Sequence, residues 1–386
     1  MTAVNCPHGR MEFDYSCAIS RTSQTKLTAI TDRLLMDAGS LHKDALVIDT
    51  HIDTATHLLW RSPDFSQRLS EGHVDIPRLR AGGVDAAMFA VWIDEGFSNE
   101  HALKLVLRGI DAIHRTIASY PDDLMFARTA ADVRKAREQG KIAVLITIEG
   151  GRVICDDLGI LRMLNDLGVC SITLAWGAAT GWIDSHNHQR HGGLTAFGRE
   201  VVREMQRLNM LVDISHVSEA AFWEVLNIAE RPVFASHSSC RALLDHTRNM
   251  WDPMIEAMAK NDGVININFF GGFIGANPDS GNVEAPLRKP AIYRDPFDRI
   301  AYPVPEPGPP LSRLVDHFNH AIRVAGAEHV GIGSDFDGVT QLPQGMEDMS
   351  KLPALTSGLL DAGHSESVVR AVLGENDLRL FEKTLS

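Results

Sequence analysis

Short apolar runs rich in β-branched residues recur along the chain, and most are followed by a segment whose apolar residues have helical spacing. Near-continuous apolar runs of this kind are typical of strands that are buried on both faces. The pattern predicts eight strands, at 45–49, 84–92, 142–148, 169–174, 211–215, 233–236, 264–268 and 330–334.

The segments between these runs predict helices. Leu194, Phe197, Val201, Met205 and Leu208 follow i, i+3/i+4 spacing, and similar patterns occupy 101–118, 157–167, 218–229 and 311–325. Alternating strands and helices predict a parallel sheet with right-handed crossovers. Eight repeats favour a closed (β/α)8, TIM-like barrel. A doubly wound sheet is the alternative, but no GxGxxG motif opens a helix after the first strand.

Composition agrees with an ordinary globular protein. The 386 residues are 44% hydrophobic and 23% charged, which allows a large core and excludes a disordered chain. We expect one catalytic domain at 41–386, preceded by an N-terminal leader at 1–40. The proline-rich stretch 277–310 follows the seventh predicted strand, so it is interpreted as a loop on the active-site side, with a disordered insertion as the alternative.

The net charge and the cysteine content indicate which classes of partner and which compartment to expect. A net charge of −13 provides no basic footprint for nucleic acid or an anionic membrane surface. No apolar run reaches the length of about 18 residues that a transmembrane helix needs, and the N-terminus lacks the apolar core of a signal peptide. The five scattered cysteines suit a reducing cytoplasm. A small-molecule substrate is therefore the expected partner, and a homodimer is compatible with the sequence.

Polar residues collect where five of the predicted strands end. In a (β/α)8 barrel the carboxyl ends of the strands converge on one face, where active sites lie. Imidazole and carboxylate groups at this density suit Zn²⁺ or a similar ion, and six groups favour two metals that share a carboxylate. A nucleophilic enzyme is less favoured, because there is no GxSxG motif. The six residues are His51, Asp53, Glu149, His216, His237 and Asp335.

These residues lie in longer motifs that resemble a known family. The motifs are DTHID (49–53), IEGG (148–151), GGLTAFGREVVREMQRLNMLVDISHVS (192–218), ASHSSCRAL (235–243), TRNM (247–250), GIGSDFDGV (331–339) and PQGMEDMSKLP (343–353). From about residue 44 to its end, the chain resembles the membrane (renal) dipeptidase family of zinc metallopeptidases, in the amidohydrolase superfamily, and looks like a soluble member of the bacterial type.

The resemblance implies a distorted (β/α)8, TIM-like barrel of the metal-dependent hydrolase type, with two zinc ions. His51 and Asp53 would hold one ion, His216 and His237 would hold the other, and Glu149 would bridge them as part of the catalytic set. A hydroxide between the ions would be the nucleophile.

Two further residues acquire roles through the same resemblance. Asp335 would take the proton of the attacking water and pass it to the leaving amine. Arg248 lies eleven residues after His237, as in the family pattern, and would bind the terminal carboxylate of the substrate through its planar guanidinium.

Trp176 departs from the family pattern. The family usually has a substrate-contacting histidine after the fourth strand, whereas here the stretch 172–177 reads ITLAWG. Indole donates one N–H but cannot take up a proton. The change predicts either weaker turnover of ordinary dipeptides or an apolar wall for an unusual substrate. Two alternatives remain: His186, His188 or His191 of the following loop replaces the histidine, or Trp176 only packs.

The sequence thus favours a zinc-dependent dipeptidase that hydrolyses a small dipeptide with a free C-terminal carboxylate. The alternative is a diverged amidohydrolase that acts on an N-acyl amino acid, a cyclic amide or a biosynthetic intermediate. A non-catalytic relative is disfavoured, because so many acidic and imidazole groups are costly to desolvate without a metal.

Overall fold

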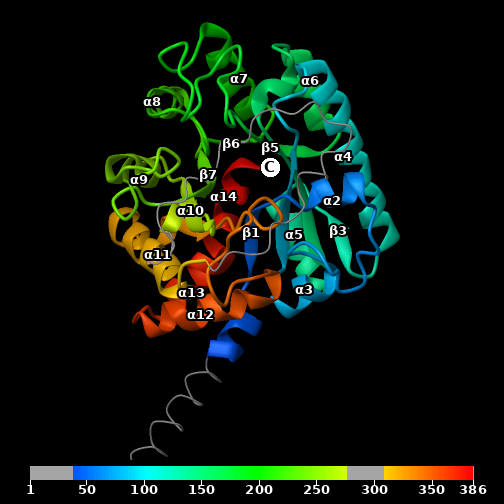
Figure 1. Cartoon of the computed structure of the whole chain (residues 1–386), viewed down its shortest axis with the longest axis vertical. Helices are drawn as coiled ribbons and strands as arrows, with labels where there is room; N and C mark the ends of the chain where they lie inside the picture. Colours follow the sequence, from blue (N-terminus) through cyan, green and yellow to red (C-terminus); the bar gives the residue numbers. More distant parts are fainter. Residues whose placement is uncertain (1–37, 276–307, 386) are drawn as a thin grey trace, which may run out of the picture. The chain divides into compact units, whose positions relative to one another are not determined.

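Eight parallel strands close into a barrel, which confirms the predicted fold class. The structure is a computed structural model that describes residues 38–275 and 308–385. The sheet order is β2-β1-β9-β8-β7-β6-β5-β4-β3, and an additional pairing of β2 with β4 closes the ring (Figure 1). The strands are β1 Ile48–Ile52, β2 Ala86–Trp92, β3 Leu124–Phe126, β4 Ile142–Glu149, β5 Val169–Thr173, β6 Leu211–Asp213, β7 Phe234–Ser238, β8 Val264–Ile267 and β9 Val330–Ile332.

Helices cover the outside of this ring, and the segments with helical spacing form helices as predicted. The helices are α2 Thr54–Trp60, α3 Ile76–Ala81, α4 Asn99–Ser119, α5 Ala130–Glu138, α6 Leu158–Asp166, α7 Ala196–Arg207, α8 Glu219–Ile228, α9 Asp252–Lys260, α10 Gly271–Ile274, α11 Leu311–Ala325, α12 Leu352–Asp361, α13 Glu366–Arg370 and α14 Asn376–Thr384.

Strand β3 was not predicted from the sequence. It pairs with the first half of β4, from Ile142 to Val144, and β5 pairs along the same strand from Ile146 onward. The strand therefore extends the sheet without entering the barrel. Its three residues are too few for a clear apolar run.

The first strand lies further along the chain than predicted, at Ile48–Ile52 rather than at 45–49. The polar run that begins at Asp49 suggested a strand end, but the strand pairs through it. Thr50 donates its hydroxyl to the carbonyls of Ser236 and Ile332, and Asp49 accepts the backbone N–H of His51 and Ser334. Because these polar groups find partners inside the barrel, they are compatible with a buried strand.

The C-terminal helix α14 closes the base of the barrel. Figure 1 shows it, in red, at the centre of the ring of strands. Its apolar side chains pack on the residues that fill the lower interior. Burying one large apolar side chain, such as that of Phe381, contributes about 1.5–3 kcal/mol. This cluster includes Ile48, Met88, Leu145, Leu211, Phe234, Val264, Leu380 and Phe381.

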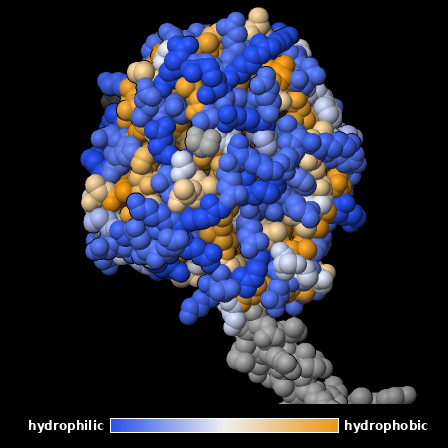
Figure 2. Space-filling model, turned by 180° about the vertical axis from the view of Figure 1, so that it is seen from behind, coloured by the Kyte–Doolittle hydropathy of each residue, from blue (hydrophilic) through white to orange (hydrophobic). Residues whose placement is uncertain are grey.

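The expected leader at 1–40 and the proline-rich loop at 277–310 lie almost wholly outside the described residues, and the domain division stays a prediction. Within the described part of the chain, no helix is both long enough and apolar enough to cross a membrane. On the face shown in Figure 2, hydrophilic side chains predominate and hydrophobic ones form separate patches.

A buried carboxyl group joins α14 to the barrel. Asp377 is fully buried, and neither its oxygens nor the Oδ1 atom of Asn266 has a hydrogen-bond partner among the described residues. A Cβ on Gly331 would clash with both side chains, so the two groups approach each other across this glycine. Burial and the nearby Asp49 raise the pKa of Asp377 to about 8. A protonated Asp377 would donate a hydrogen bond to Oδ1 of Asn266, and both side chains would then have a partner.

We predict that this carboxyl group makes folding stability fall as the pH rises from about 4 to 8. The folded state holds a proton on Asp377 that the unfolded chain releases near pH 3.8, so the unfolded state is favoured progressively above that pH. Asp377→Asn supplies a permanent donor and should gain about 2 kcal/mol or more of unfolding free energy relative to wild type between pH 5 and 8. Urea unfolding at both pH values measures the difference. Asp361→Asn, at an exposed position of α12, should follow the wild type; parallel profiles for all three proteins would contradict the prediction.

Candidate metal centre

Six acidic and imidazole side chains meet at the carboxyl end of the barrel. His51 belongs to β1, Glu149 ends β4, and His237 belongs to β7. Asp53, His216 and Asp335 follow β1, β6 and β9 within three residues. The barrel therefore brings together residues that are up to 284 positions apart, the separation of His51 and Asp335. All six side chains are buried or nearly so.

Glu149 lies at the centre, and its two carboxylate oxygens face different partners. Oε1 is 2.8 Å from Nε2 of His216 and 3.2 Å from Nε2 of His237. Oε2 is 3.8 Å from Nε2 of His51, and this nitrogen is 3.5 Å from Oδ2 of Asp53. The side chains thus form two groups that share one carboxylate.

Two overlapping sets of these side chains, both of which include His51, have the spacing of metal ligands. His51, Glu149 and His237 place ligand atoms within 4.8 Å of one another, and so do His51, Asp53 and Asp335. Nε2 of His216 faces Nε2 of His237 at 2.9 Å, although at most one proton can lie between two neutral imidazole nitrogens. Nε2 of His51 and Oδ1 of Asp53 are buried without a hydrogen-bond partner among the described residues. Convergent lone pairs without donors are typical of a cation site.

The electrostatics of the cluster also favour a cation. Burial, together with the neighbouring carboxylates, raises the pKa values of Glu149 and Asp335. Burial opposes a charge on His51, but the carboxylates of Glu149 and Asp53 outweigh it and raise the pKa of this histidine. Burial lowers the pKa values of His216 and His237, so both are neutral imidazoles, the form that binds metal.

Hydrogen bonds behind the cluster fix the orientation of His237. The Ser236 hydroxyl donates to the carboxylate of Asp213 at 2.6 Å, and its oxygen lies 2.7 Å from Nδ1 of His237. An imidazole that is held through one nitrogen presents the other in a fixed direction. Ser236 and Asp213 were not predicted as site residues.

The loop after β9 holds Asp335 in a strained backbone conformation. Asp335 and Asp337 have φ values of 65° and 69°, in the left-handed region that non-glycine residues rarely adopt. The carboxylate of Asp337 accepts hydrogen bonds from the Thr54 hydroxyl and the backbone N–H of His73. The side-chain amide of Asn268 donates to Oδ2 of Asp335 at 2.9 Å. Asn268 was not predicted as a site residue, although it follows β8 directly and the strand-end pattern could have found it.

Arg248 lies beside the cluster and is anchored to the end of β7. Its Nη2 donates to the carbonyl of His237 at 2.9 Å and its Nη1 to the Ser238 hydroxyl at 3.3 Å, while Nε has no partner among the described residues. Burial lowers the pKa of Arg248 to about 10, so the guanidinium stays charged at neutral pH. It is a buried cation with a free donor next to the candidate metal ligands.

Trp176 lies at the rim of the same site. Its ring centroid is 6.0 Å from that of His216 and 5.0 Å from that of Trp92, the last residue of β2. Trp92 was not predicted as a site residue, because an apolar residue at a strand end carries no chemical signal of its own.

His186 also reaches the site, from the loop before α7. Its ring is 5.8 Å from that of His216, and its Nδ1 is 2.8 Å from the Thr247 hydroxyl. Burial and the nearby charge of Arg248 lower its pKa to about 2, which keeps the ring neutral.

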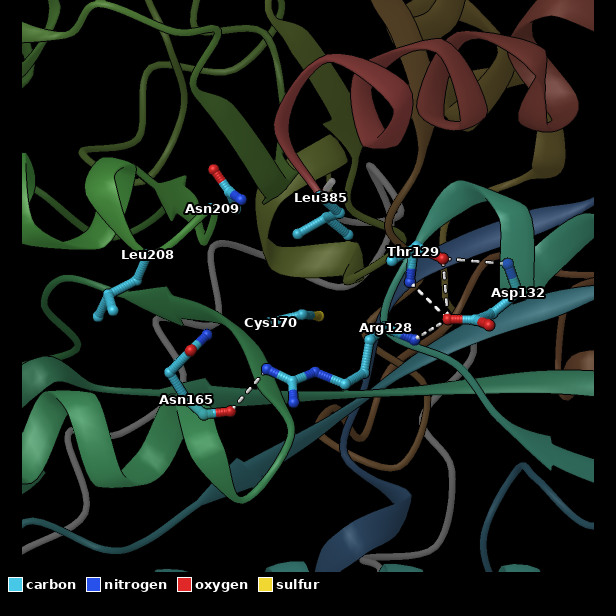
Figure 3. Close-up of a pocket in the computed structure, with 8 residues that line it drawn as sticks. All are labelled: Arg128, Thr129, Asp132, Asn165, Cys170, Leu208, Asn209 and Leu385. Carbon is cyan, nitrogen blue, oxygen red and sulfur yellow. Dashed lines mark hydrogen bonds between the residues drawn. The ribbon is translucent and has the colours of Figure 1, made fainter.

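A hollow of about 330 Å³ lies at the opposite end of the barrel (Figure 3). It opens near the first residues of β5 and β6, and its chemistry differs from that of the metal-ligand cluster. It is lined by Arg128, Thr129, Asp132, Asn165, Cys170, Leu208, Asn209 and Leu385. The Arg128 guanidinium donates to the carbonyl of Asn165, and Asp132 caps the start of α5 together with Thr129. These groups serve the fold.

Comparisons with known proteins agree with this architecture. The family model for membrane dipeptidase (peptidase family M19) matches residues 35–385. Dipeptidase verJ of Clonostachys rogersoniana is 33% identical over 371 residues, covering 92% of this chain and 88% of the relative. An uncharacterized dipeptidase of Schizosaccharomyces pombe is 33% identical over 365 residues, covering 89% of this chain and 81% of the relative.

Solved structures show the same relationship. Dipeptidase AC, a metallopeptidase, superimposes with a TM-score of 0.76 at 27% identity, covering 88% of this chain and 98% of that one. A metallopeptidase of Rhodobacter sphaeroides, bound to a phosphinate mimic of the dipeptide L-Ala-D-Ala, gives a TM-score of 0.74 at 26% identity, covering 88% and 100%. The chain therefore belongs to the membrane dipeptidase family, peptidase family M19, and is a metal-dependent peptide-bond hydrolase.

Proposed function

We propose that the protein is a zinc-dependent dipeptidase with two metal ions, which hydrolyses a dipeptide that has a free C-terminal carboxylate. The observation that carries the proposal is the position of Glu149, whose two oxygens face two separate groups of ligand atoms. The solved relative with a bound dipeptide mimic supports a dipeptide as the substrate.

In this proposal His51 and Asp53 would hold one ion, His216 and His237 would hold the other, and the carboxylate of Glu149 would be shared by both. When bound, the ions would supply Lewis acidity that lowers the pKa of water and polarises a carbonyl group. Imidazole and carboxylate ligands are the set that zinc prefers, although manganese and cobalt accept similar ligands.

The residues around the ions perform the remaining steps. Asp335 takes the proton released as water attacks the scissile carbonyl and delivers it to the leaving amine. Its raised pKa suits a group that must both accept and release a proton near neutrality. Arg248 binds the terminal carboxylate, and its contacts with the end of β7 hold the guanidinium in place for that task. Trp176 and the neutral His186 complete the rim against which the substrate lies.

We further propose a reducing compartment such as the cytoplasm, because Cys155, Cys170 and Cys240 carry free thiols in the part of the chain that the structure describes.

The first prediction from this model concerns metal content. Protein loaded with an equimolar mixture of zinc, manganese and cobalt ions should bind about two ions per chain, mostly zinc, by elemental analysis. Glu149→Gln should weaken the binding of both ions, because each loses an anionic ligand. Glu256→Gln, at an exposed position of α9, should retain both. A reproducible content near zero in wild type would exclude the two-metal model.

The second prediction separates the two roles open to Asp335, whose carboxylate lies within ligand distance of His51 and Asp53. Asp335→Asn should retain both metals and lose about 10²–10⁴-fold in kcat, because an amide cannot accept the proton of water. Metal content and kcat are measured on the same sample. Loss of metal would make Asp335 mainly a ligand, and turnover within about threefold of wild type would exclude it as the proton carrier.

The third prediction tests the carboxylate contact. Arg248→Lys keeps the charge but loses the planar guanidinium, so kcat/KM for free-acid dipeptides should fall by about tenfold or more. The C-terminal amides of the same dipeptides should be affected less. Arg241→Lys, at an arginine that pairs with Asp245 instead, should change neither value. Equal losses on acids and amides would show that Arg248 does not recognise the carboxylate.

A further inference from the structure

A tryptophan lies across the mouth of the barrel from Arg248, and a second tryptophan packs against it. In the closed ring, three strands separate β2 from β7 in either direction, so the two strands lie opposite each other. Arg248 is anchored to the end of β7, and Trp92 is the last residue of β2. Charge recognition and an aromatic surface therefore lie on opposite sides of the candidate metal ligands.

Register places the indole of Trp92 on the same side of the sheet as Glu149. The two residues are direct partners in the β2–β4 pairing, and paired residues in adjacent strands direct their side chains to the same face. Because the carboxylate of Glu149 lies in the metal-ligand cluster, the indole of Trp92 lies on the face of the sheet that carries this cluster. Both Trp92 and Trp176 are half-buried, so each retains a surface that a ligand can cover.

The Trp92–Trp176 pair is held in place by its surroundings. The two ring centroids are 5.0 Å apart at an interplanar angle of 58°. The carboxylate of Glu95 accepts the backbone N–H of Ala178 at 2.7 Å and contacts Gly177, so it fixes the loop that begins at Trp176. A fixed aromatic surface binds an apolar partner at little further cost in conformational entropy.

We propose that this tryptophan pair determines specificity by contacting the side chain of the substrate's N-terminal residue, and that the preferred substrates are dipeptides whose first residue is large and apolar, above all aromatic. The proposal rests on the proposed function. A dipeptide that binds Arg248 through its carboxylate and has its amide bond at the metal ligands must extend its N-terminal residue away from β7, across the barrel towards Trp92 at the end of β2 and the Trp176 ring that packs against it. Trp92 and Trp176 are what it meets there.

Two dipeptides of identical composition test which residue of the substrate the tryptophan pair recognises. For wild-type protein, kcat/KM for L-Phe-L-Ala should exceed that for L-Ala-L-Phe by about tenfold or more, with L-Ala-L-Ala near the lower value. Trp176→Ala and Trp92→Ala should each reduce the ratio to near one, and Trp176→Phe should retain most of it. Because the ratio compares two substrates on one preparation, partial misfolding leaves it unchanged. Trp223→Ala, at an exposed tryptophan of α8, is the matched control and should keep the wild-type ratio.

Binding provides a readout that does not depend on turnover. Calorimetry of both dipeptides with metal-loaded Asp335→Asn should show the same preference in Kd, and the Trp176→Ala change in that background should abolish it. Hydrolysis of both dipeptides at equal rates, or a preference for L-Ala-L-Phe, would overturn the proposed specificity while the dipeptidase function stands. Tighter binding of L-Phe-L-Ala without hydrolysis of any dipeptide by wild type would overturn the dipeptidase function and support the aromatic contact. If the protein neither binds nor hydrolyses these dipeptides, both the dipeptidase function and the aromatic contact are overturned.

Discussion

The burial of several carboxylates around Glu149 is the constraint on which this site depends. Glu149, Asp53 and Asp335 lie within a few ångströms of His51, in surroundings that exclude most water. Like charges at such distances repel strongly in a medium of low dielectric constant. Arg248 alone is too little positive charge to balance them, and a divalent cation is the natural complement. The same repulsion that makes the cluster costly to assemble gives it affinity for metal.

Apolar packing that stabilises the barrel lies mainly at its base, whereas the metal-ligand cluster lies at its mouth. At the base, α14 and the apolar lower interior pack without strained backbone in that helix. At the mouth, His216 and Asp335 both adopt positive φ values. Backbone strain of this kind costs on the order of 1–3 kcal/mol for each residue and persists only where the surroundings enforce it. The hydrogen bonds of Asp337 and Asn268 hold the loop after β9 in place, so the strain at Asp335 persists at the end where chemistry takes place.

Sequence reasoning could predict the parts of this arrangement that repeat. The alternation of apolar runs with helical spacing predicted the closed barrel, and the convergence of strand ends predicted that His51, Glu149 and His237 would lie together. It could not predict what depends on individual contacts. The boundary of β1 was misplaced because the polar run 49–51 finds its partners on other strands, which are distant in the sequence. Trp92 was missed for the same reason, since its relation to Trp176 exists only once β2 and β5 are placed in the ring.

The position of Trp176 shows why family membership leaves the substrate open. The candidate metal ligands and Asp335 lie on β1, β4, β6, β7 and β9 or directly after them, whereas Trp176 lies on the loop after β5, which carries no ligand. A change on that loop can therefore alter the surface that meets the substrate without disturbing a single metal contact. The neutral ring of His186, further along the same loop, approaches His216 and keeps a polar group at the rim, although position 176 is apolar. Hydrolytic chemistry and substrate selection are thus carried by different loops of one barrel, and selection can diverge while the chemistry is retained.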